Sequence, residues 1–343
     1  MHNPRFCAEK RPRFFRSTTL LSGIAVATLA LTLTGGAATA KPGADYSAAK
    51  SPASFENIQW ESTPDPVFTD PDDGMAKDPS IFFAKGQYYM FYTGTLPGFQ
   101  GGGQAGEPWT LEFATSPDGV DWTKQGTLLE ADCGGWEACR VQAPSKPIFH
   151  QGKFYMFYTG GPRTPTNIIY TGYATSTDLV HWTKEGQITQ TVAQPQNVNR
   201  ANDMYIFKDR GSFYMFYTTY GTNGEQIFKR ESKDLVNWSE PELTGAEGEG
   251  TTIWKEGTTY YLLAAQGFSG LGEDYHLYGS STLDNFQEIG LANLDRPSFA
   301  SGSLGHGDVI DMGSEIWFYF QGTNDGGKTF DVGLAKHKKL HPN

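Results

Sequence analysis

Long hydrophobic runs are almost absent from this chain of 343 residues. The one clear run, Leu20–Leu33, is too short to cross a membrane comfortably, which argues against a membrane-inserted protein. It follows a basic start and precedes Ala38-Thr39-Ala40, and together these features predict a secretory signal peptide over residues 1–40. We therefore expect a secreted protein with a flexible leader over residues 41–54 and one catalytic domain over residues 55–343.

Cysteine is equally scarce, with three residues in the whole chain, so disulfide bonds cannot hold this fold together. Cys7 is lost with the signal peptide, which leaves Cys133 and Cys139. Two cysteines six residues apart in a Gly-containing loop of an exported chain favour a disulfide over a metal pair. We predict a Cys133–Cys139 bond that stiffens a single loop.

Basic residues are in the minority. Removing the five basic and one acidic residues of the signal peptide leaves 22 Lys and Arg against 37 Asp and Glu, a net charge of −15. Such a surface repels nucleic acid and anionic lipid. Neutral sugars fit better, so we expect a monomer with a carbohydrate substrate, no nucleic-acid partner and no membrane insertion.

What the chain has in abundance is a repeated aromatic phrase. The phrase reads Gln87-Tyr-Tyr-Met-Phe-Tyr-Thr-Gly94 and returns at 153–160 and 212–218. About thirty residues after each copy comes a second signal with a central Trp, at 121–124, 181–184 and 237–240. A period near sixty residues, dense in aromatic and β-branched side chains, predicts an all-β fold, a β-propeller of four-stranded blades.

The repeat predicts five blades. Their first strands begin near Asp78, Ala143, Asp203, Glu249 and His306. The fifth blade ends without its own Trp-containing outer strand, but Ile58-Gln-Trp-Glu61 resembles that signal at the other end of the chain. We predict a five-bladed β-propeller closed by an N-terminal strand that completes the last blade, which removes both open sheet edges.

One repeat position, at the start of the first strands, holds most of the candidate catalytic residues. Aligned on the phrase, the five copies place there Asp78, Ala143, Asp203, Glu249 and His306. First strands line the propeller axis, and buried like charges are costly unless chemistry needs them, so we predict a catalytic site formed by Asp78, Asp203 and Glu249. Glu247 stays open as an alternative to Glu249, because a slip within Ala246–Gly250 exchanges them. Around this site we expect substrate contacts from Phe99, Trp109, Trp136 and His306.

Glycoside hydrolysis needs such a set of carboxyl groups. One carboxylic acid protonates the leaving oxygen, and one carboxylate activates water or attacks the sugar. A separation of roughly 6.5–9.5 Å gives inversion and about 5–5.5 Å gives retention. A third carboxylate beside the acid raises the pKa of that acid and keeps it protonated.

The blade openings resemble those of glycoside hydrolase family 43, the five-bladed group of arabinanases, arabinofuranosidases and β-xylosidases. The resemblance lies in Lys77–Ile81, Gln142–Ser145, Glu249-Gly250 and Gly305–Gly307. It implies inverting hydrolysis of arabinose- or xylose-containing saccharides, with Asp78 as general base and Glu249 as general acid. It also implies that Asp203 tunes the acid and that His306 helps to hold a hydrated calcium ion on the axis.

Other functions stay open at this point. Families 32 and 68 share the architecture but act on fructans with retention, and their Arg-Asp-Pro and Glu-Cys motifs are absent here. A propeller glycosidase of algal galactans is a further alternative, as is a non-catalytic carbohydrate-binding propeller. The sequence departs from the family at Met204, which follows Asp203 in place of Pro, and at Gln142, where arabinanases often have Trp. These departures leave the substrate open.

Overall fold

The computed structural model describes residues 60–72, 74–95, 108–162, 169–188, 201–221, 224–266, 274–292 and 294–339. The expected signal peptide, the expected leader and Phe99 lie outside these residues. Within them the chain is almost entirely β-structure, with one turn of 3₁₀ helix at Ser298–Ala300. No helix in this part of the chain is long and apolar enough to cross a membrane.

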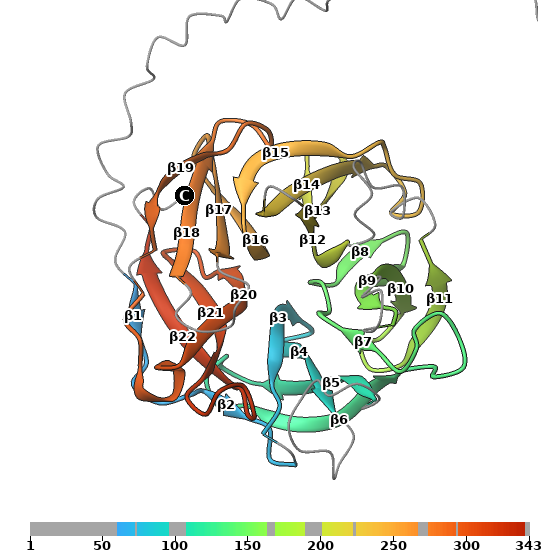
Figure 1. Ribbon diagram of the computed structural model, residues 1–343, viewed down its shortest axis with the longest axis horizontal. Coiled ribbons are helices and arrows are strands. Elements are labelled where there is room, and N and C mark those ends of the chain that lie inside the picture. Colours follow the sequence, from blue (N-terminus) through green and yellow to red (C-terminus); the bar gives the residue numbers. More distant parts are fainter. Residues whose placement is uncertain are drawn as a thin grey trace, which may run out of the picture. The chain divides into compact units, whose positions relative to one another are not determined.

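The strands form five sheets arranged as the blades of a propeller, as predicted (Figure 1). The first blade contains β3 (Lys77–Ala84), β4 (Gln87–Thr95), β5 (Trp109–Ser116) and β6 (Thr123–Glu130). The second contains β7 (Val141–Gln142), β8 (Ile148–His150), β9 (Lys153–Gly160), β10 (Tyr170–Ser176) and β11 (Trp182–Gln187). The third contains β12 (Asn202–Asp209), β13 (Ser212–Gly221), β14 (Gly224–Ser232) and β15 (Glu242–Glu247).

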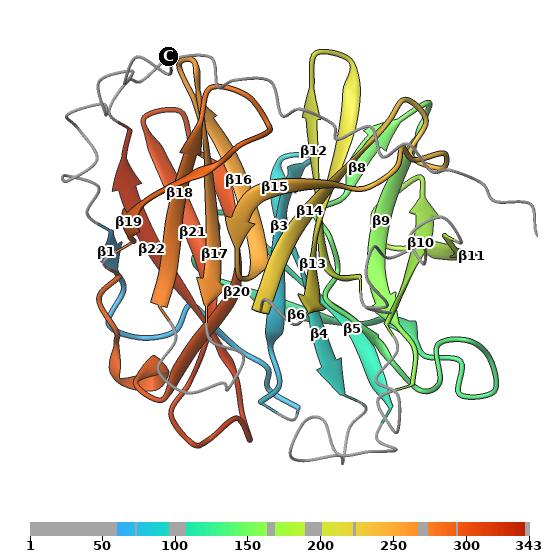
Figure 2. The same cartoon turned by 45° about the horizontal axis from the view of Figure 1, so that its top comes forward.

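The fourth blade contains β16 (Glu249–Glu256), β17 (Thr259–Gln266), β18 (Asp274–Ser280) and β19 (Gln287–Leu291). The fifth contains β20 (Ser303–Asp311), β21 (Glu315–Thr323), β22 (Asp331–Lys338), β1 (Glu61–Ser62) and β2 (Phe68–Thr69). The strands β3, β12, β16 and β20 face the centre of the ring (Figure 1), and Figure 2 shows how the strands of successive blades tilt against one another. The starts of these inner strands are therefore brought together on the axis.

The ring is closed by the N-terminal strand, which confirms the predicted closure. Glu61 and Ser62 pair with Lys336 and Ala335 of β22, and the short strand β2 pairs with the other end of β22. The last blade thus takes its outer strand from the opposite end of the chain, and no sheet edge is left open at the junction.

The repeated phrase packs the blades against one another because its side chains alternate between the two faces of a strand. In β13, Phe216 packs toward the fourth blade, in one cluster with Leu262. Its neighbours Met215 and Tyr217 pack toward the second blade, in one cluster with Phe157. Fully burying one such side chain contributes about 1.5–3 kcal/mol, so the phrase builds the core of the fold.

The second repeated signal forms a turn between the third and fourth strands. In the first blade, Asp118 Oδ1 accepts the backbone N–H groups of Val120 and Asp121 at 2.8 and 2.9 Å. Trp122 Nε1 donates to the carbonyl oxygen of Gly119 at 3.1 Å. The same contacts recur around Asp178 in the second blade. Short Asp and Ser side chains stabilise such turns, so this signal reports blade construction and not ligand binding.

Candidate active site

The first strands of four blades carry a β-bulge where they begin. Their pairing with the second strand shifts register just after Lys77, Asn202, Glu249 and Gly305. The residues that follow have a left-handed backbone, with φ of 52° at Asp78, 55° at Asp203, 62° at Gly250 and 31° at His306. A non-glycine residue held in this region costs roughly 1–3 kcal/mol and is typical of functional sites.

The predicted alignment of the fourth blade is wrong by one residue. Glu249 pairs with Ala265 at the position where Lys77 pairs with Thr93, so it shares a register with Lys77 and not with Asp78. Gly250 occupies the position of Asp78 because a Cβ there would lie 2.7 Å from the Cα atom of His306. The close approach of two blades therefore requires glycine.

Glu249 nevertheless reaches the axial cluster from its neighbouring position. Its Oε1 lies 3.3 Å from His306 Nε2, and the residue is only 9% exposed. Glu247 ends β15, the outer strand of the third blade, and is exposed. Of the two glutamates, the structure thus brings Glu249 to the axis.

His306 stands at the centre of the cluster. Its Nδ1 lies 2.8 Å from Asp78 Oδ1, and its Nε2 lies 3.3 Å from both Asp203 Oδ2 and Glu249 Oε1. Burial alone would lower the pKa of His306, but the charges of Asp203 and Asp78 raise that pKa well above its usual value. A protonated imidazole therefore holds the three predicted catalytic carboxyl groups together.

Asp78 is fixed by contacts from the second strand of its own blade and from the fifth blade. Thr93 Oγ1 donates to Asp78 Oδ2 at 2.6 Å, and the backbone N–H of Asp78 donates to Gln321 Oε1 at 2.8 Å. Burial would raise the pKa of Asp78, but the charges of Lys77 and His306 and the hydrogen bonds from His306 and Thr93 hold it well below its usual value. Asp78 is thus an ionised carboxylate at neutral pH.

Asp203 has the opposite electrostatic character. Burial, opposed by His306 but assisted by the negative charges of Glu249 and Asp78, raises the pKa of Asp203 to about 8. Asn202 Nδ2 donates to its Oδ2 at 2.9 Å, whereas Oδ1 is buried without a hydrogen-bond partner among the described residues. One carboxyl group of the cluster thus keeps a proton at neutral pH while Asp78 is ionised, which is the division of labour that acid–base catalysis requires.

The same cluster has the spacing of a metal site. Ligand atoms of Asp203, Glu249 and His306 lie within 4.8 Å of one another, which is close enough for one ion. However, calcium takes oxygen ligands, and both nitrogens of His306 already face carboxylates. The nitrogens of His306 are thus already engaged by Asp78, Asp203 and Glu249, and this arrangement does not fit the axial ion that the family resemblance implies.

A small pocket lies on the axis beside the cluster. It is lined by Asp78, Asp203 and His306 and, further along the first strands, by Ser80, Thr251 and Lys146. The hydroxyl oxygens of Ser80 and Thr251 are buried and have no hydrogen-bond partner among the described residues. Buried hydroxyl groups of this kind are suited to ordered water or to the hydroxyl groups of a sugar.

Two predicted rim aromatics are packed into the fold. Trp109, the first residue of β5, is 3% exposed, and Lys77 Nζ lies 4.9 Å from the centre of its ring. Trp136 stacks on Tyr158 with ring centroids 5.9 Å apart. Trp109 therefore lies beside Lys77, which precedes Asp78 in the sequence. Trp136 lies against the second blade.

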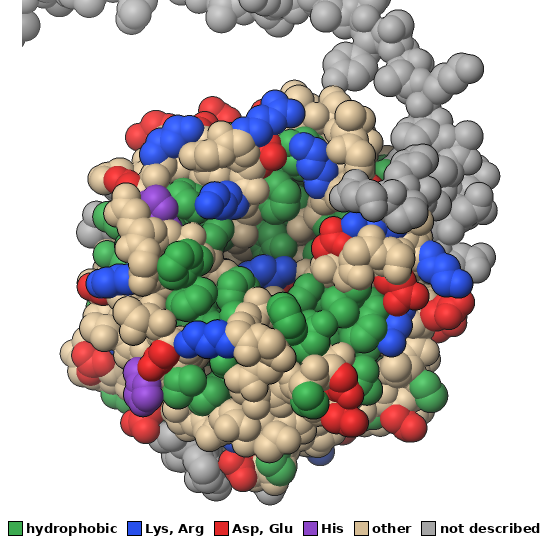
Figure 3. Space-filling view, turned by 180° about the vertical axis from the view of Figure 1, so that it is seen from behind, with side chains coloured by type: hydrophobic (Ala, Val, Ile, Leu, Met, Phe, Trp, Pro, Cys, Tyr) green, Lys and Arg blue, Asp and Glu red, His purple; other side chains and the backbone are tan. Residues whose placement is uncertain are grey.

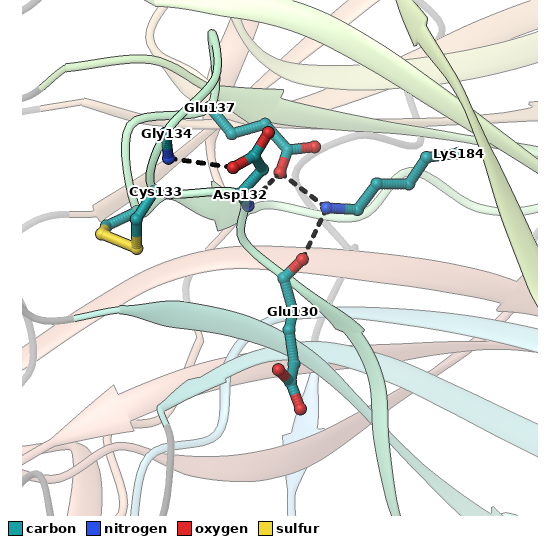
Figure 4. The surroundings of a disulfide bond; sticks show 7 residues. Glu130, Asp132, Cys133, Gly134, Glu137 and Lys184 are labelled. Atoms are coloured by element: carbon teal, nitrogen blue, oxygen red, sulfur yellow. Dashed lines mark hydrogen bonds and ion pairs between the residues drawn. A yellow bond between two sulfur atoms is a disulfide. The ribbon is translucent and has the colours of Figure 1, made fainter.

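Cys133 and Cys139 form a disulfide in the loop that precedes β7 (Figure 4). Glu137 anchors this loop from inside: its Oε2 accepts the backbone N–H of Asp132 and the Nζ of Lys184, both at 2.6 Å. Tyr158 donates its hydroxyl to the other carboxylate oxygen of Glu137 at 2.7 Å. The disulfide thus adds to a loop that buried polar contacts already hold.

Sequence reasoning missed several residues that position the cluster. Thr93 belongs to the repeated phrase that predicts the blades, and its hydroxyl also holds Asp78. Lys77 and Gln321 also act on Asp78, and Lys146 lines the pocket. The threonine of the phrase was a usable signal, because it stands beside the bulge in the paired strand, whereas the others depend on contacts between distant parts of the chain.

Comparisons with known proteins agree with this architecture. The sequence matches the profile of Glycosyl hydrolases family 43 over residues 68–333. No curated protein sequence matches the chain. Similar solved structures share at most 20% identity with the chain in the three cases that follow, so they establish the fold alone.

The first is a thermostable family-43 glycoside hydrolase, with 20% identity, a TM-score of 0.62, and coverage of 80% of this chain and 97% of that one. The second is the GH43_1 enzyme from Xanthomonas citri complexed with xylotriose, with 14% identity, a TM-score of 0.60, and coverage of 82% and 94%. The third is the catalytic domain of a Coprinopsis cinerea GH62 alpha-L-arabinofuranosidase, with 14% identity, a TM-score of 0.59, and coverage of 82% and 97%. Because the family profile covers most of the chain and the five-bladed fold agrees with it, this protein is a glycosidase that belongs to glycoside hydrolase family 43.

Proposed function

We propose that this glycosidase is secreted and releases arabinose or xylose units from polysaccharides or oligosaccharides by inversion. Asp78 acts as the general base and Glu249 as the general acid. One observation carries the proposal. The ionised Asp78 contacts one nitrogen of the His306 ring, and the carboxyl groups of Asp203 and Glu249 contact the other.

The geometry of His306 supports inversion. The two nitrogens of an imidazole point away from each other, so Asp78 and Glu249 stand on different sides of the ring. Such a placement favours the roughly 6.5–9.5 Å separation of inverting pairs over the about 5–5.5 Å of retaining pairs. The wider separation leaves room for a water molecule between the base and the sugar.

The proposed reaction has two proton transfers, one to Asp78 and one from Glu249. Asp78 accepts a proton from water as the water oxygen attacks the anomeric carbon, and Glu249 donates a proton to the departing glycosidic oxygen. The bond from the anomeric carbon to that oxygen breaks, and the sugar leaves with inverted configuration. Ligand atoms of Asp203 and Glu249 lie within 4.8 Å of each other, so repulsion between the two carboxylates retains a proton in this pair, and Glu249 can deliver it to the leaving oxygen.

The substrate class rests on analogy and on charge. Similar structures include an alpha-L-arabinofuranosidase and an enzyme complexed with xylotriose. The negative net charge of the chain favours neutral sugars over polyanions. Secretion is supported by the pattern of residues 1–40 and by a disulfide, which persists in oxidising compartments.

The test is a screen for sugar release from arabinan, xylan, galactan and fructan by the parent protein, Asp78→Asn and Glu249→Gln. We expect release from arabinan or xylan, a loss of several orders of magnitude in both variants, and unchanged oligosaccharide binding by calorimetry. Release from fructan or galactan alone would overturn the substrate class. Sugar binding without turnover in the parent would show a non-catalytic propeller.

A further inference from the structure

The axial pocket contains a lysine that the proposed reaction does not use. Lys146 lies between β7 and β8 in the second blade, and its Nζ is 3.0 Å from Asp308 Oδ1 in the fifth. The same Nζ donates to the carbonyl oxygen of Val309 at 2.5 Å. It also lies 5.6 Å from the centre of the Tyr205 ring in the third blade. Figure 3 shows the face opposite to that of Figure 1, with a basic side chain at the centre of its hollow.

Contacts with Asp308 fix this ammonium group on the axis. Asp308 Oδ2 accepts the backbone N–H of Ile81 from the first blade at 2.7 Å. Thr252 from the fourth blade donates its hydroxyl to Asp308 Oδ1 at 3.3 Å. Together with Lys146 and Tyr205, these contacts bring all five blades to one ion pair. Lys146 is therefore a fixed part of the axis.

The charge of this group is equally fixed. Burial alone would lower the pKa of Lys146, but the negative charge of Asp308 raises it above its usual value. Lys146 lines the same pocket as His306, Asp78 and Asp203. A divalent cation entering the pocket would meet the ammonium group of Lys146 on one side and, on the other, an imidazole whose two nitrogens both face carboxylate oxygens.

We propose that Lys146, together with His306, takes the place of a divalent metal on the propeller axis, so that this protein folds and works without calcium. The lysine joins the blades as a central ion would, and the histidine contacts all three carboxyl groups of the cluster. This inference does not depend on which sugar is cleaved, because its readouts are metal content and thermal stability.

The first test uses the parent protein, purified and dialysed without chelator. We expect substoichiometric calcium by mass spectrometry of the metal content, and an unfolding temperature that neither EDTA nor added calcium changes. A ligand that binds only the folded protein, present at a hundredfold excess over its dissociation constant, stabilises the fold measurably. One calcium per chain, with a fall in unfolding temperature on chelation, would overturn the proposal.

The second test compares Lys146→Met with Lys184→Met, which removes another partly buried lysine, bound to Glu137 away from the axial pocket. Loss of the axial ammonium leaves Asp308 unpaired in the pocket, so calcium is expected to raise the unfolding temperature of Lys146→Met by several degrees. The Lys184→Met control is expected to show no response to calcium. Equal calcium responses in both variants, or none in Lys146→Met, would show that Lys146 does not exclude the ion. If Lys146→Met does not fold, the metal content of the parent still decides the proposal.

Discussion

Replacing Thr93 with Val tests how Asp78 is held as a base. The two side chains have similar shapes, but valine has no hydroxyl group. The change removes the 2.6 Å hydrogen bond to Asp78 Oδ2 and also the acceptor for the backbone N–H of Ala143 at 2.7 Å. Both groups are buried, so neither gains water in exchange.

The expected magnitude follows from the charge of the acceptor. A hydrogen bond to an ionised group contributes about 1.5–3 kcal/mol, and one pKa unit corresponds to about 1.36 kcal/mol. The pKa of Asp78 is held below its usual value partly by Thr93, so Thr93→Val should raise it by roughly one to two units. The carboxylate also loses orientation, for which we expect a roughly tenfold fall in kcat/KM at neutral pH.

The assay is the pH profile of kcat/KM on the best substrate from the screen. Asp78 must be ionised to act, so the acid limb of the profile should move to higher pH in Thr93→Val and stay in place in Thr93→Ser. Thr159→Val is the matched control, because Thr159 has the same place in the phrase but lies 3.9 Å from the sulfur of Met204. If Thr93→Val keeps both the acid limb and the plateau of the parent, Thr93 does not position the base.

Three other predictions concern the same architecture. Asp203→Asn should unfold at a higher temperature than the parent at pH 7 yet hydrolyse far more slowly. The pKa of Asp203 is raised to about 8 from an ordinary value near 4, so the parent loses stability as pH rises through this window, and the two melting temperatures should converge toward pH 4. Gly250→Ala should destabilise the fold by more than Gly257→Ala: both glycines have positive φ, but only at Gly250 would a Cβ meet His306. Cys133→Ser should cost at most about 2 kcal/mol, measured by denaturant unfolding, and leave kcat unchanged, because the closed loop is short and Glu137 still anchors it.

The repeated phrase and the Trp-containing signal together were enough to predict the five blades and their closure. Its alternating side chains fill the spaces between blades, so the pattern in the sequence and the packing in space have one cause. The residues at the axial position could also be predicted from the sequence. The left-handed residues Asp78, Asp203, Gly250 and His306 each stand nine positions before the start of the second strand, and only Ala143 stands ten before. A strict spacing would have selected Gly250.

The rest of the site could not be predicted because it depends on bulges and on long-range pairs. A bulge changes which side chain faces the axis, so Glu249 reaches His306 from a different register than Asp78 does. Lys146 meets Asp308 only after the ring has closed, and no local pattern joins two residues so far apart. The positions of the charges that raise or lower each pKa follow from that closure.

The stereochemistry of the first product tests the catalytic assignment most directly. Proton NMR of an arabinoside or xyloside, recorded within the first minutes of hydrolysis by the parent protein, identifies the anomer before mutarotation. With Asp78 activating water and Glu249 protonating the leaving oxygen, the first sugar released should have inverted anomeric configuration. A product with retained configuration would contradict the role of Asp78 as general base.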